Sequence, residues 1–582
     1  MAVLTTEQRE AVNSKNHATV AACPGSGKTR CIVAKLIRCA EEVRETPRKV
    51  ACITYTNVAA NEIYRRLQRS GSNGDDELCD VSTIHSFCQN SVLRHFHWKI
   101  PELENGYRVL APEVDLFKEY VDVVADRHQL SDFAKRSFSS LSRLPDGSPV
   151  VSGGITEEAA VEFWHTLLND GYLDFSGLVF YAYRILCEYG SLRQNIAARY
   201  AHLLIDEFQD TTALQCELFK LIFAEGLTKF FLVGDEEQSI YSFAGANREL
   251  MSEFTTYVEG KRFPLSGNFR SSKNIVDAAQ RVIQREPPMH SVGDWKDCAE
   301  QPTIVEGDGD FEVVTDYFLP KIDELNVPFG ETAILAPNWF KLLPIGKQLR
   351  DYGIPVVGPG ARPYRRSNMF SDLTEQICAQ VDQNDPALIR NAERALFQLV
   401  ENLTGKPNLS IFSFNGRRVL YRLIEVGGSL AEKHENVSGW LTEAAEAFRS
   451  ILSEEGLLGN KSGAFLRIAA RDMLRDMERN NTDPDNMELG ALGMFANPRG
   501  SMKLLTFHGA KGREFSAVLM IAANDGLIPY YNYYNPLSNE GEEEGRRLFY
   551  VAVTRAKRIL YISTGDDSKP PSRYISELGL NA

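Results

Sequence analysis

Short apolar runs alternate with amphipathic helical runs through the first part of the chain. Strand-like runs at 50–54 (VACIT) and 80–87 (DVSTIHSF) flank a helical pattern at 57–67. This alternation is typical of a parallel sheet whose strands are joined by helices. The pattern is mostly helical from 96 to 170, and the alternation then resumes and runs from 171 to 262. We therefore predict an α/β domain that is interrupted by a helical insert.

A second α/β pattern begins near Phe263 and is interrupted in the same way. Its predicted strands are 302–307, 332–337 and 354–358 before a helical stretch, and 502–507 and 516–523 after it. The fold class is therefore α/β, with two parallel-sheet domains that each carry a mainly helical insert. The predicted bounds are 1–95 and 171–262 for the first domain, 96–170 for its insert, 263–365 and 496–582 for the second domain, and 366–495 for its insert.

A glycine-rich loop, AACPGSGKT at 21–29, joins an apolar strand to a helical pattern. Gly25 and Gly27 allow a tight turn that brings backbone N–H groups close to phosphate oxygens. The start of the following helix adds partial positive charge. Lys28 is placed to reach the β- and γ-phosphates, and the Thr29 hydroxyl to bind Mg²⁺. Taken alone, the loop could also be an ordinary glycine-rich turn.

A second chemical signal is the pair of acids that ends an apolar strand at 203–210 (LLIDEFQD). Asp206 and Glu207 follow this strand, at the sheet edge where open α/β folds bind ligands. Asp206 suits Mg²⁺ coordination, and Glu207 suits orienting or deprotonating an attacking water. A solvated turn is the alternative, and the Lys28 loop upstream argues against it.

Composition narrows the class of protein. The chain has 582 residues, 43% hydrophobic and 24% charged, which is typical of soluble globular domains. It has neither an apolar run long enough to span a bilayer nor a signal peptide at its start, so we expect no membrane partner. Its ten cysteines form no C-x-x-C pair, which indicates reduced thiols and a cytoplasmic location. The net charge of −14 argues against a basic nucleic-acid coat but leaves room for a local basic groove.

The motifs, read in order, resemble the UvrD/Rep/PcrA family of superfamily 1 DNA helicases over residues 4–577. This family has two RecA-like P-loop domains, 1A and 2A, with helical inserts 1B and 2B. ATP lies between the RecA-like domains, and single-stranded DNA crosses their top. Besides the loop and the acid pair, the resemblance rests on LTTEQREAVN (4–13), TYTNVAANEIYRRL (54–67), STIHSF (82–87), GYLDFSGLV (171–179), VGDEEQSIYSFAGA (233–246), LSGNFRSS (265–272), MKLLTFHGAKGREFSAV (502–518) and EEEGRRLFYVAVTRAK (542–557).

The resemblance implies ATP and Mg²⁺ as cofactors, with Thr29 and Asp206 as the metal ligands. Gln238 would sense the γ-phosphate, Arg270 would reach it from domain 2A, and Arg555 would act as an arginine finger. The implied catalytic residues are Lys28, Asp206, Glu207, Gln238, Arg270 and Arg555. The implied nucleotide-binding residues are Gln8, which would bond adenine, the loop residues Ala22, Cys23, Pro24, Gly25, Ser26, Gly27, Lys28, Thr29 and Arg30, then Phe269 beside adenine and Glu514 at the ribose.

The same resemblance implies a track for single-stranded DNA. Aromatic rings would stack on bases, which tolerates any sequence, and polar groups would bond the backbone. The implied DNA-binding residues are Tyr55, Asn57, Thr83, His85, Tyr241, Phe243, Thr506 and His508. The family usually has Trp at position 243 and often a basic residue at 244, so Phe243 and Ala244 predict a weaker grip on DNA.

Two functions follow as alternatives. The first is an ATP-driven translocase or helicase that moves 3′→5′ on single-stranded DNA, or on DNA with a 3′ single-stranded end, in DNA repair. The second is a DNA- or nucleotide-sensing ATPase subunit that regulates a partner nuclease of the OLD/TOPRIM type, with little unwinding of its own. The short inserts favour the second, because the compact build is similar to helicase-like subunits of Gabija-type anti-phage defence systems.

Overall fold

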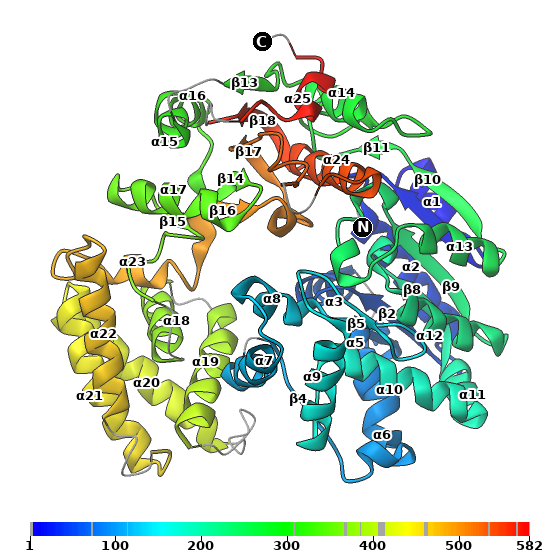
Figure 1. Ribbon diagram of the computed structural model, residues 1–582, viewed down its shortest axis with the longest axis horizontal. Coiled ribbons are helices and arrows are strands. Elements are labelled where there is room, and N and C mark those ends of the chain that lie inside the picture. The colour runs from blue at the N-terminus through cyan, green and yellow to red at the C-terminus, as the bar shows by residue number, and fades with distance from the viewer. Residues whose placement is uncertain are drawn as a thin grey trace. The chain divides into compact units, whose positions relative to one another are not determined.

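The computed structural model has two compact units (Figure 1). Residues 1–298 and 537–550 form the first unit, and residues 299–536 and 551–582 form the second. Residues 263–298 thus pack with the first unit, whereas the sequence pattern assigned them to the second α/β domain. The structure describes residues 4–70, 74–112, 114–305, 309–365, 369–383, 386–404, 414–458, 464–532, 536–565 and 569–580.

A parallel six-stranded sheet forms the centre of the first unit, in the order β10-β1-β9-β8-β2-β3. Its inner strands are almost entirely apolar, as expected for a sheet that is covered on both faces. The loop and the acid pair that were predicted to bind a nucleotide follow β1 and β8. The strands are β1 (Ala18–Ala22), β2 (Lys49–Thr54), β3 (Cys79–Thr83), β8 (Tyr200–Ile205), β9 (Lys229–Gly234) and β10 (Lys261–Leu265).

Helices cover both faces of this sheet with two separate hydrophobic clusters. One cluster includes α1 (Thr6–Val12), α2 (Lys28–Val43) and α3 (Asn57–Ser70). The other includes α10 (Phe175–Glu188), α11 (Gly190–Arg199), α12 (Ala213–Ala224) and α13 (Glu249–Tyr257). The unit also contains α14 (Lys273–Val282) and the first twelve residues of α24 (Asn539–Val553).

The segment 80–87 is not a strand throughout, as its apolar pattern suggested. β3 ends at Thr83, and a short helix, α5 (Ile84–Phe87), follows. The Thr83 hydroxyl accepts a hydrogen bond from the backbone N–H of Ser86 at 3.3 Å and so caps this helix. A capping threonine thus overrides the apolar run, since the cap satisfies an N–H that the helix leaves unpaired.

The predicted insert at 96–170 is mostly helical and has its own apolar core. It contains α7 (Asp115–Arg127), α8 (Asp132–Ser137) and α9 (Glu157–Asn169). Aromatic side chains of Phe117, Phe138 and Phe163 meet edge to face in this core. Between α8 and α9 lies a small antiparallel pair, β5 (Ser142–Arg143) and β6 (Pro149–Val150).

The second unit is built around another parallel six-stranded sheet, in the order β13-β18-β17-β14-β16-β15. Each strand predicted in this part of the chain is present, although several are shorter than expected, and residues 306–307 lie outside the described residues. Two parallel sheets with helices confirm the predicted fold class. The strands are β13 (Thr303–Val305), β14 (Thr332–Ala336), β15 (Val356–Val357), β16 (Met502–Thr506), β17 (Phe515–Met520) and β18 (Ala556–Ser563).

The stretch 366–495 is a helical bundle with a separate core, apart from residues outside the described ranges (366–368, 384–385, 405–413 and 459–463). In Figure 1 its helices stand apart from the strands of the second sheet. Among the described residues, none of the helices is long and apolar enough to cross a membrane. The bundle helices are α18 (Met369–Gln383), α19 (Pro386–Thr404), α20 (Phe414–Lys433), α21 (Val437–Glu454), α22 (Phe465–Arg479) and α23 (Leu489–Gly493).

Candidate functional site

The glycine-rich loop has the backbone that a phosphate cradle requires. Gly25 and Gly27 have φ angles of +69° and +82°, which residues with a side chain rarely adopt. Gly27 precedes α2 without a side-chain cap, so the N–H groups at this helix start are placed for an anion. The Ser26 hydroxyl is buried and has no hydrogen-bond partner among the described residues. These features fit the phosphates of a nucleotide.

The predicted acids lie next to this loop. Lys28 Nζ is 3.5 Å from Glu207 Oε2, and Glu207 has a positive φ of +52° at the end of β8. Burial, and then the neighbouring Glu207, raise the pKa of Asp206 to about 7. A divalent cation at Asp206 would favour its ionised form. Mg²⁺ binding by Thr29 and Asp206 stays a prediction.

A hydrogen-bond network continues from Glu207 to Gln238. Gln209 Nε2 donates to Glu207 Oε2 at 2.6 Å, and Gln209 Oε1 accepts from the backbone N–H of Asp235 at 2.9 Å. Asp235 Oδ2 then accepts from Gln238 Nε2 at 2.5 Å. Gln209 is fully buried, so its two bonds satisfy an amide that would otherwise be costly to bury. The network connects Glu207, the acid predicted to activate water, to Gln238, the predicted γ-phosphate sensor.

The predicted motif around Phe269 packs directly against the loop. The backbone N–H of Phe269 donates to the Gly25 carbonyl at 2.9 Å, and the Arg30 guanidinium lies 5.5 Å from the centre of the Phe269 ring. Phe269 and Arg270 therefore belong, by their contacts, to the first compact unit. The resemblance placed Arg270 in domain 2A.

Gln8 lies beside the same loop, and both ends of its amide are engaged. Its Oε1 accepts from the backbone N–H of Thr5 at 3.1 Å, and its Nε2 donates to the Ser26 carbonyl at 2.8 Å. Gln8 is 1% exposed, so in this structure the amide braces the loop from within. Adenine recognition by Gln8 stays a prediction.

The remaining residues predicted to bind the nucleotide, Arg555 and Glu514, lie in the second unit. Arg555 is 1% exposed; its Nε donates to the Val551 carbonyl at 2.8 Å and its Nη1 to the Arg513 carbonyl at 3.2 Å. Glu514 is exposed and forms an ion pair with Lys557 at 2.9 Å. The roles of these residues as arginine finger and ribose ligand stay predictions.

Thr506 and His508, the predicted DNA contacts of the second unit, lie at the carboxyl end of β16. The Thr506 hydroxyl accepts from the backbone N–H of Gly509 at 3.1 Å. Burial, and then the neighbouring Lys511, lower the pKa of His508 to about 4.

Four of the residues predicted to contact DNA line one pocket of about 290 Å³ in the first unit. Tyr55 and Tyr241 are stacked, with ring centres 5.5 Å apart and an angle of 16° between them. Phe243 is 43% exposed and meets Tyr241 edge to face at 6.0 Å. Burial lowers the pKa of His85 to about 4, so His85 is neutral at pH 7. Flat, partly exposed rings in one pocket suit the stacking of bases.

Asn57 and Thr83, also predicted for this track, do not line the pocket. Asn57 is exposed at the start of α3, and Thr83 is 6% exposed with its hydroxyl committed to capping α5.

Sequence reasoning missed several residues of these sites. Phe175 lines the same aromatic pocket and lies 5.0 Å from the His85 ring, although its motif received no chemical role. Arg143, from the insert, also lines the pocket and is 8% exposed, with its guanidinium 4.0 Å from the Trp164 ring centre. For Phe175 the signal was its place in a family motif, whereas Arg143 carries no motif.

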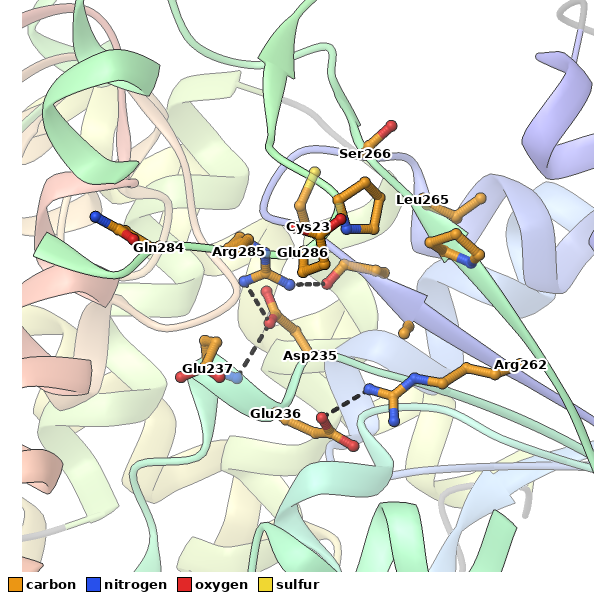
Figure 2. A pocket seen from close by; sticks show the side chains of 14 residues that line it. Cys23, Asp235, Glu236, Glu237, Arg262, Leu265, Ser266, Gln284, Arg285 and Glu286 are labelled. Carbon is orange, nitrogen blue, oxygen red and sulfur yellow. Dashed lines mark hydrogen bonds and ion pairs between the residues drawn. The ribbon is translucent and has the colours of Figure 1, made fainter. Parts of the chain in front are cut away.

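A second pocket, of about 340 Å³, lies behind the loop at the carboxyl ends of β1, β9 and β10 (Figure 2). Arg285, which follows α14, reaches from its wall to the Asp235 carboxylate. Arg262 and Glu236 form another ion pair in this pocket at 2.7 Å. The sequence motifs assigned no role to Arg285.

Comparison with known proteins gives matches over both units. Residues 4–259 match the UvrD/REP helicase N-terminal domain, and residues 485–566 match the UvrD-like helicase C-terminal domain. The chain is 25% identical to DNA helicase II of Rickettsia typhi, over 99% of this chain and 95% of that protein. It is 24% identical to the ATP-dependent DNA helicase PcrA of Staphylococcus aureus, over 99% of this chain and 86% of that protein.

Proposed function

Since the chain belongs to the UvrD-like helicase family, and with it to the ATP-dependent DNA helicases, we propose that it hydrolyses Mg-ATP to move 3′→5′ along single-stranded DNA. The direction rests on the family resemblance. The hydrolysis chemistry rests on the residues around the glycine-rich loop, and the substrate rests on the aromatic pocket. A DNA repair role likewise rests on the family resemblance.

The observation that carries the proposal is the joining of Lys28, Glu207 and Gln238 by contacts within one unit. Lys28 lies 3.5 Å from Glu207, and Gln209 and Asp235 continue the network from Glu207 to Gln238. A charge for the phosphates, a carboxylate for the water and a polar sensor are the parts that phosphoryl transfer needs. Each is supplied by a different segment of the chain.

Each of these residues has a distinct role in the proposed hydrolysis. Lys28 offsets negative charge on the β- and γ-phosphates, and Glu207 orients and deprotonates the attacking water. Thr29 and Asp206 would hold Mg²⁺, which supplies charge neutralisation at the phosphates when bound. Arg270 and Arg555 are proposed to stabilise the charge that develops on the γ-phosphate.

The aromatic pocket is proposed to hold bases of the single strand. Tyr55, Tyr241, Phe243 and Phe175 present ring faces or edges there, and His85 contacts Phe175 as a neutral ring. Stacking contributes about 1–3 kcal/mol per base and does not depend on base identity. We therefore expect binding without sequence preference.

The test is steady-state ATP hydrolysis by the purified chain, with and without single-stranded DNA. We expect strong stimulation by DNA, and we expect Glu207→Gln to lower turnover by about 100-fold or more, because it removes the base but keeps the side-chain shape. Glu259→Gln is the matched control, since Glu259 is also a glutamate with a φ of +52° but is exposed and precedes β10. The control should keep wild-type turnover.

Strand displacement on duplexes with a 3′ or a 5′ single-stranded tail then tests direction. Unwinding of the 3′-tailed duplex alone supports 3′→5′ movement. ATP hydrolysis that DNA does not stimulate, in protein that binds nucleotide, would contradict the motor and favour a sensing subunit.

A further inference from the structure

Arg285 and Asp235 form a buried ion pair directly behind the glycine-rich loop. Arg285 Nη1 is 2.8 Å from Asp235 Oδ1, and the two side chains are 13% and 0% exposed. Figure 2 shows the guanidinium between the Asp235 carboxylate and the chain near Cys23. A charged pair this deep must be held by good geometry, because both charges lose their hydration.

Arg285 makes two further contacts that tie this pair to other segments. Its Nη2 donates to the Ala22 carbonyl at 2.8 Å, at the end of β1 where the glycine-rich loop begins. Its Nη1 lies 3.3 Å from the Tyr550 hydroxyl on α24. One guanidinium therefore connects the end of β1, the segment after β9 and Tyr550 of α24, and these residues all belong to the first unit.

Asp235, which is held by Arg285, in turn restrains Gln238 by hydrogen bonding. Its Oδ2 accepts from Gln238 Nε2 at 2.5 Å, and its Oδ1 accepts from the backbone N–H of Glu237 at 3.2 Å. These bonds fix the direction of the Gln238 amide, which is 4% exposed. The same segment is held from a second side, since Arg547 Nε donates to the Ser239 carbonyl at 2.9 Å.

The electrostatics of the pair favour a fixed arrangement. Burial by itself lowers the pKa of Arg285, but the Asp235 carboxylate outweighs this effect, so the pKa lies above its usual range. Arg285 thus stays charged at any working pH. Replacing it with a neutral side chain would leave the Asp235 carboxylate buried without this partner, which is costly.

We propose that Arg285 is a positioning residue for ATP hydrolysis, which through Asp235 orients the Gln238 amide toward the γ-phosphate and ties that orientation to the start of the glycine-rich loop. The proposal rests on the proposed function, because it needs Gln238 to act on the γ-phosphate. ADP lacks that phosphate. Loss of Arg285 should therefore affect triphosphate and diphosphate differently.

The experiment compares Arg285→Gln, Arg285→Lys and the matched control Arg262→Gln with the wild-type chain. Arg262 lies in the same pocket and pairs with Glu236, but it is 47% exposed and does not contact Asp235. The measurements are the Kd values of fluorescent ADP and of a non-hydrolysable ATP analogue, together with kcat and KM for ATP.

We expect Arg285→Gln to lower the preference for the analogue over ADP by about 10-fold, equivalent to about 1.4 kcal/mol, and to lower kcat. ADP affinity should stay near the wild-type value. Arg285→Lys keeps the charge but not the planar fork that spans two acceptors, so its preference should fall in between. Arg262→Gln should match the wild type.

Gln238→Ala provides the decisive background. If Arg285 acts through Gln238, adding Arg285→Gln to Gln238→Ala should cause no further loss of preference for the analogue. Equal loss of ADP and analogue affinity in the single variant would overturn the proposal and show that Arg285 only supports the loop.

Two further outcomes are possible: the Arg285→Gln variant does not fold, or the wild-type chain shows no triphosphate preference or ATP hydrolysis. If Arg285→Gln does not fold, an unchanged preference in Arg285→Lys overturns the inference. If the wild-type chain itself does not prefer the triphosphate or hydrolyse ATP, the proposed function fails. If the wild-type chain does both, and the Arg285 variants keep its nucleotide preference and kcat, only this inference is overturned.

Discussion

At the scale of single residues, Gly25 is a position in the glycine-rich loop where backbone conformation and packing both exclude a side chain. Its φ is +69°, and an added Cβ would lie 2.7 Å from Arg270 Cβ and 2.9 Å from Asn268 Oδ1. Gly74 has a φ of +93°, but an added Cβ there meets nothing within 4 Å. Substituting Gly74 therefore tests backbone strain alone, whereas substituting Gly25 tests strain together with a steric clash of the added Cβ.

We predict that Gly25→Ala abolishes nucleotide binding, because the loop must move away from Arg270 and Asn268 to admit the methyl group. Gly74→Ala carries the backbone strain alone and should cost about 1 kcal/mol of stability without affecting binding. Isothermal titration with ADP and thermal melting of both variants provide the check. Normal ADP binding by Gly25→Ala would contradict the cradle described for this loop.

Phe243 offers a second test at this scale. We predict that Phe243→Ala lowers DNA-stimulated turnover severalfold and spares basal hydrolysis, because its half-exposed ring lines the aromatic pocket rather than the nucleotide loop. Tyr352→Ala, at an exposed ring beyond the end of α17 (Trp339–Asp351), is the control. Equal loss of basal and stimulated rates would remove Phe243 from the DNA track.

At the scale of elements, the helical bundle of the second unit has its own core. Trp440 of α21 is fully buried there, and its Nε1 donates to the Gly427 carbonyl at 3.0 Å. Gly427 is required at this crossing, since a Cβ would lie 2.6 Å from Ile377 Cγ2. The bundle core therefore depends on the Trp440 ring, which packs against the backbone of α20 at Gly427.

We predict that Trp440→Ala destabilises the bundle by about 3–5 kcal/mol, because it leaves a large cavity and removes the indole hydrogen bond to the Gly427 carbonyl. Basal ATP hydrolysis should persist, since the nucleotide residues of the first unit do not rely on this core. Tyr421→Ala, at an exposed ring of α20 in the same bundle, should change stability little. Circular dichroism melts measure the stability of each variant, and steady-state assays measure its basal ATP hydrolysis. Loss of hydrolysis in a folded Trp440→Ala variant would show that ATP hydrolysis depends on the bundle core.

At the scale of the whole molecule, several histidines are held neutral. Burial is the main cause that lowers the pKa of His85, His202 and His508 to about 4 in each case. In the unfolded chain a histidine has its ordinary pKa of about 6.5. Between the folded pKa of about 4 and the unfolded pKa of about 6.5, these histidines bind protons in the unfolded chain but not in the folded protein. The folded state therefore becomes less stable as the pH falls through this range.

We therefore predict full histidine-dependent stability above about pH 6.5 and a progressive loss between about pH 6.5 and 4. Melting temperatures measured without nucleotide across this range should fall most steeply there. His85→Asn should flatten the decline, because it removes one of the titrating groups. An equal decline in the variant would show that His85 does not contribute.

Much of the fold and part of the site could be predicted, because their signals are local. The loop residues from Ala22 to Arg30 are adjacent in sequence, so their turn and helix follow from short-range chemistry. The segment 80–87 was harder, since a single capping hydroxyl at Thr83 outweighed an apolar pattern. The role of Arg285 could not be predicted from the sequence, because no motif surrounds it and its ion-pair partner Asp235 lies fifty positions earlier.

The sequence by itself determined the two parallel sheets with their helical stretches and the position of the glycine-rich loop, since the apolar periodicity and the contiguous motifs are local features of the chain. Only the tertiary structure decided which distant segments meet. It placed Gln8 against Ser26, Phe175 against His85, and Arg285 against Asp235. These contacts depend on how parallel strands order themselves in the sheet, and that order is set by packing on both faces rather than by neighbours in sequence.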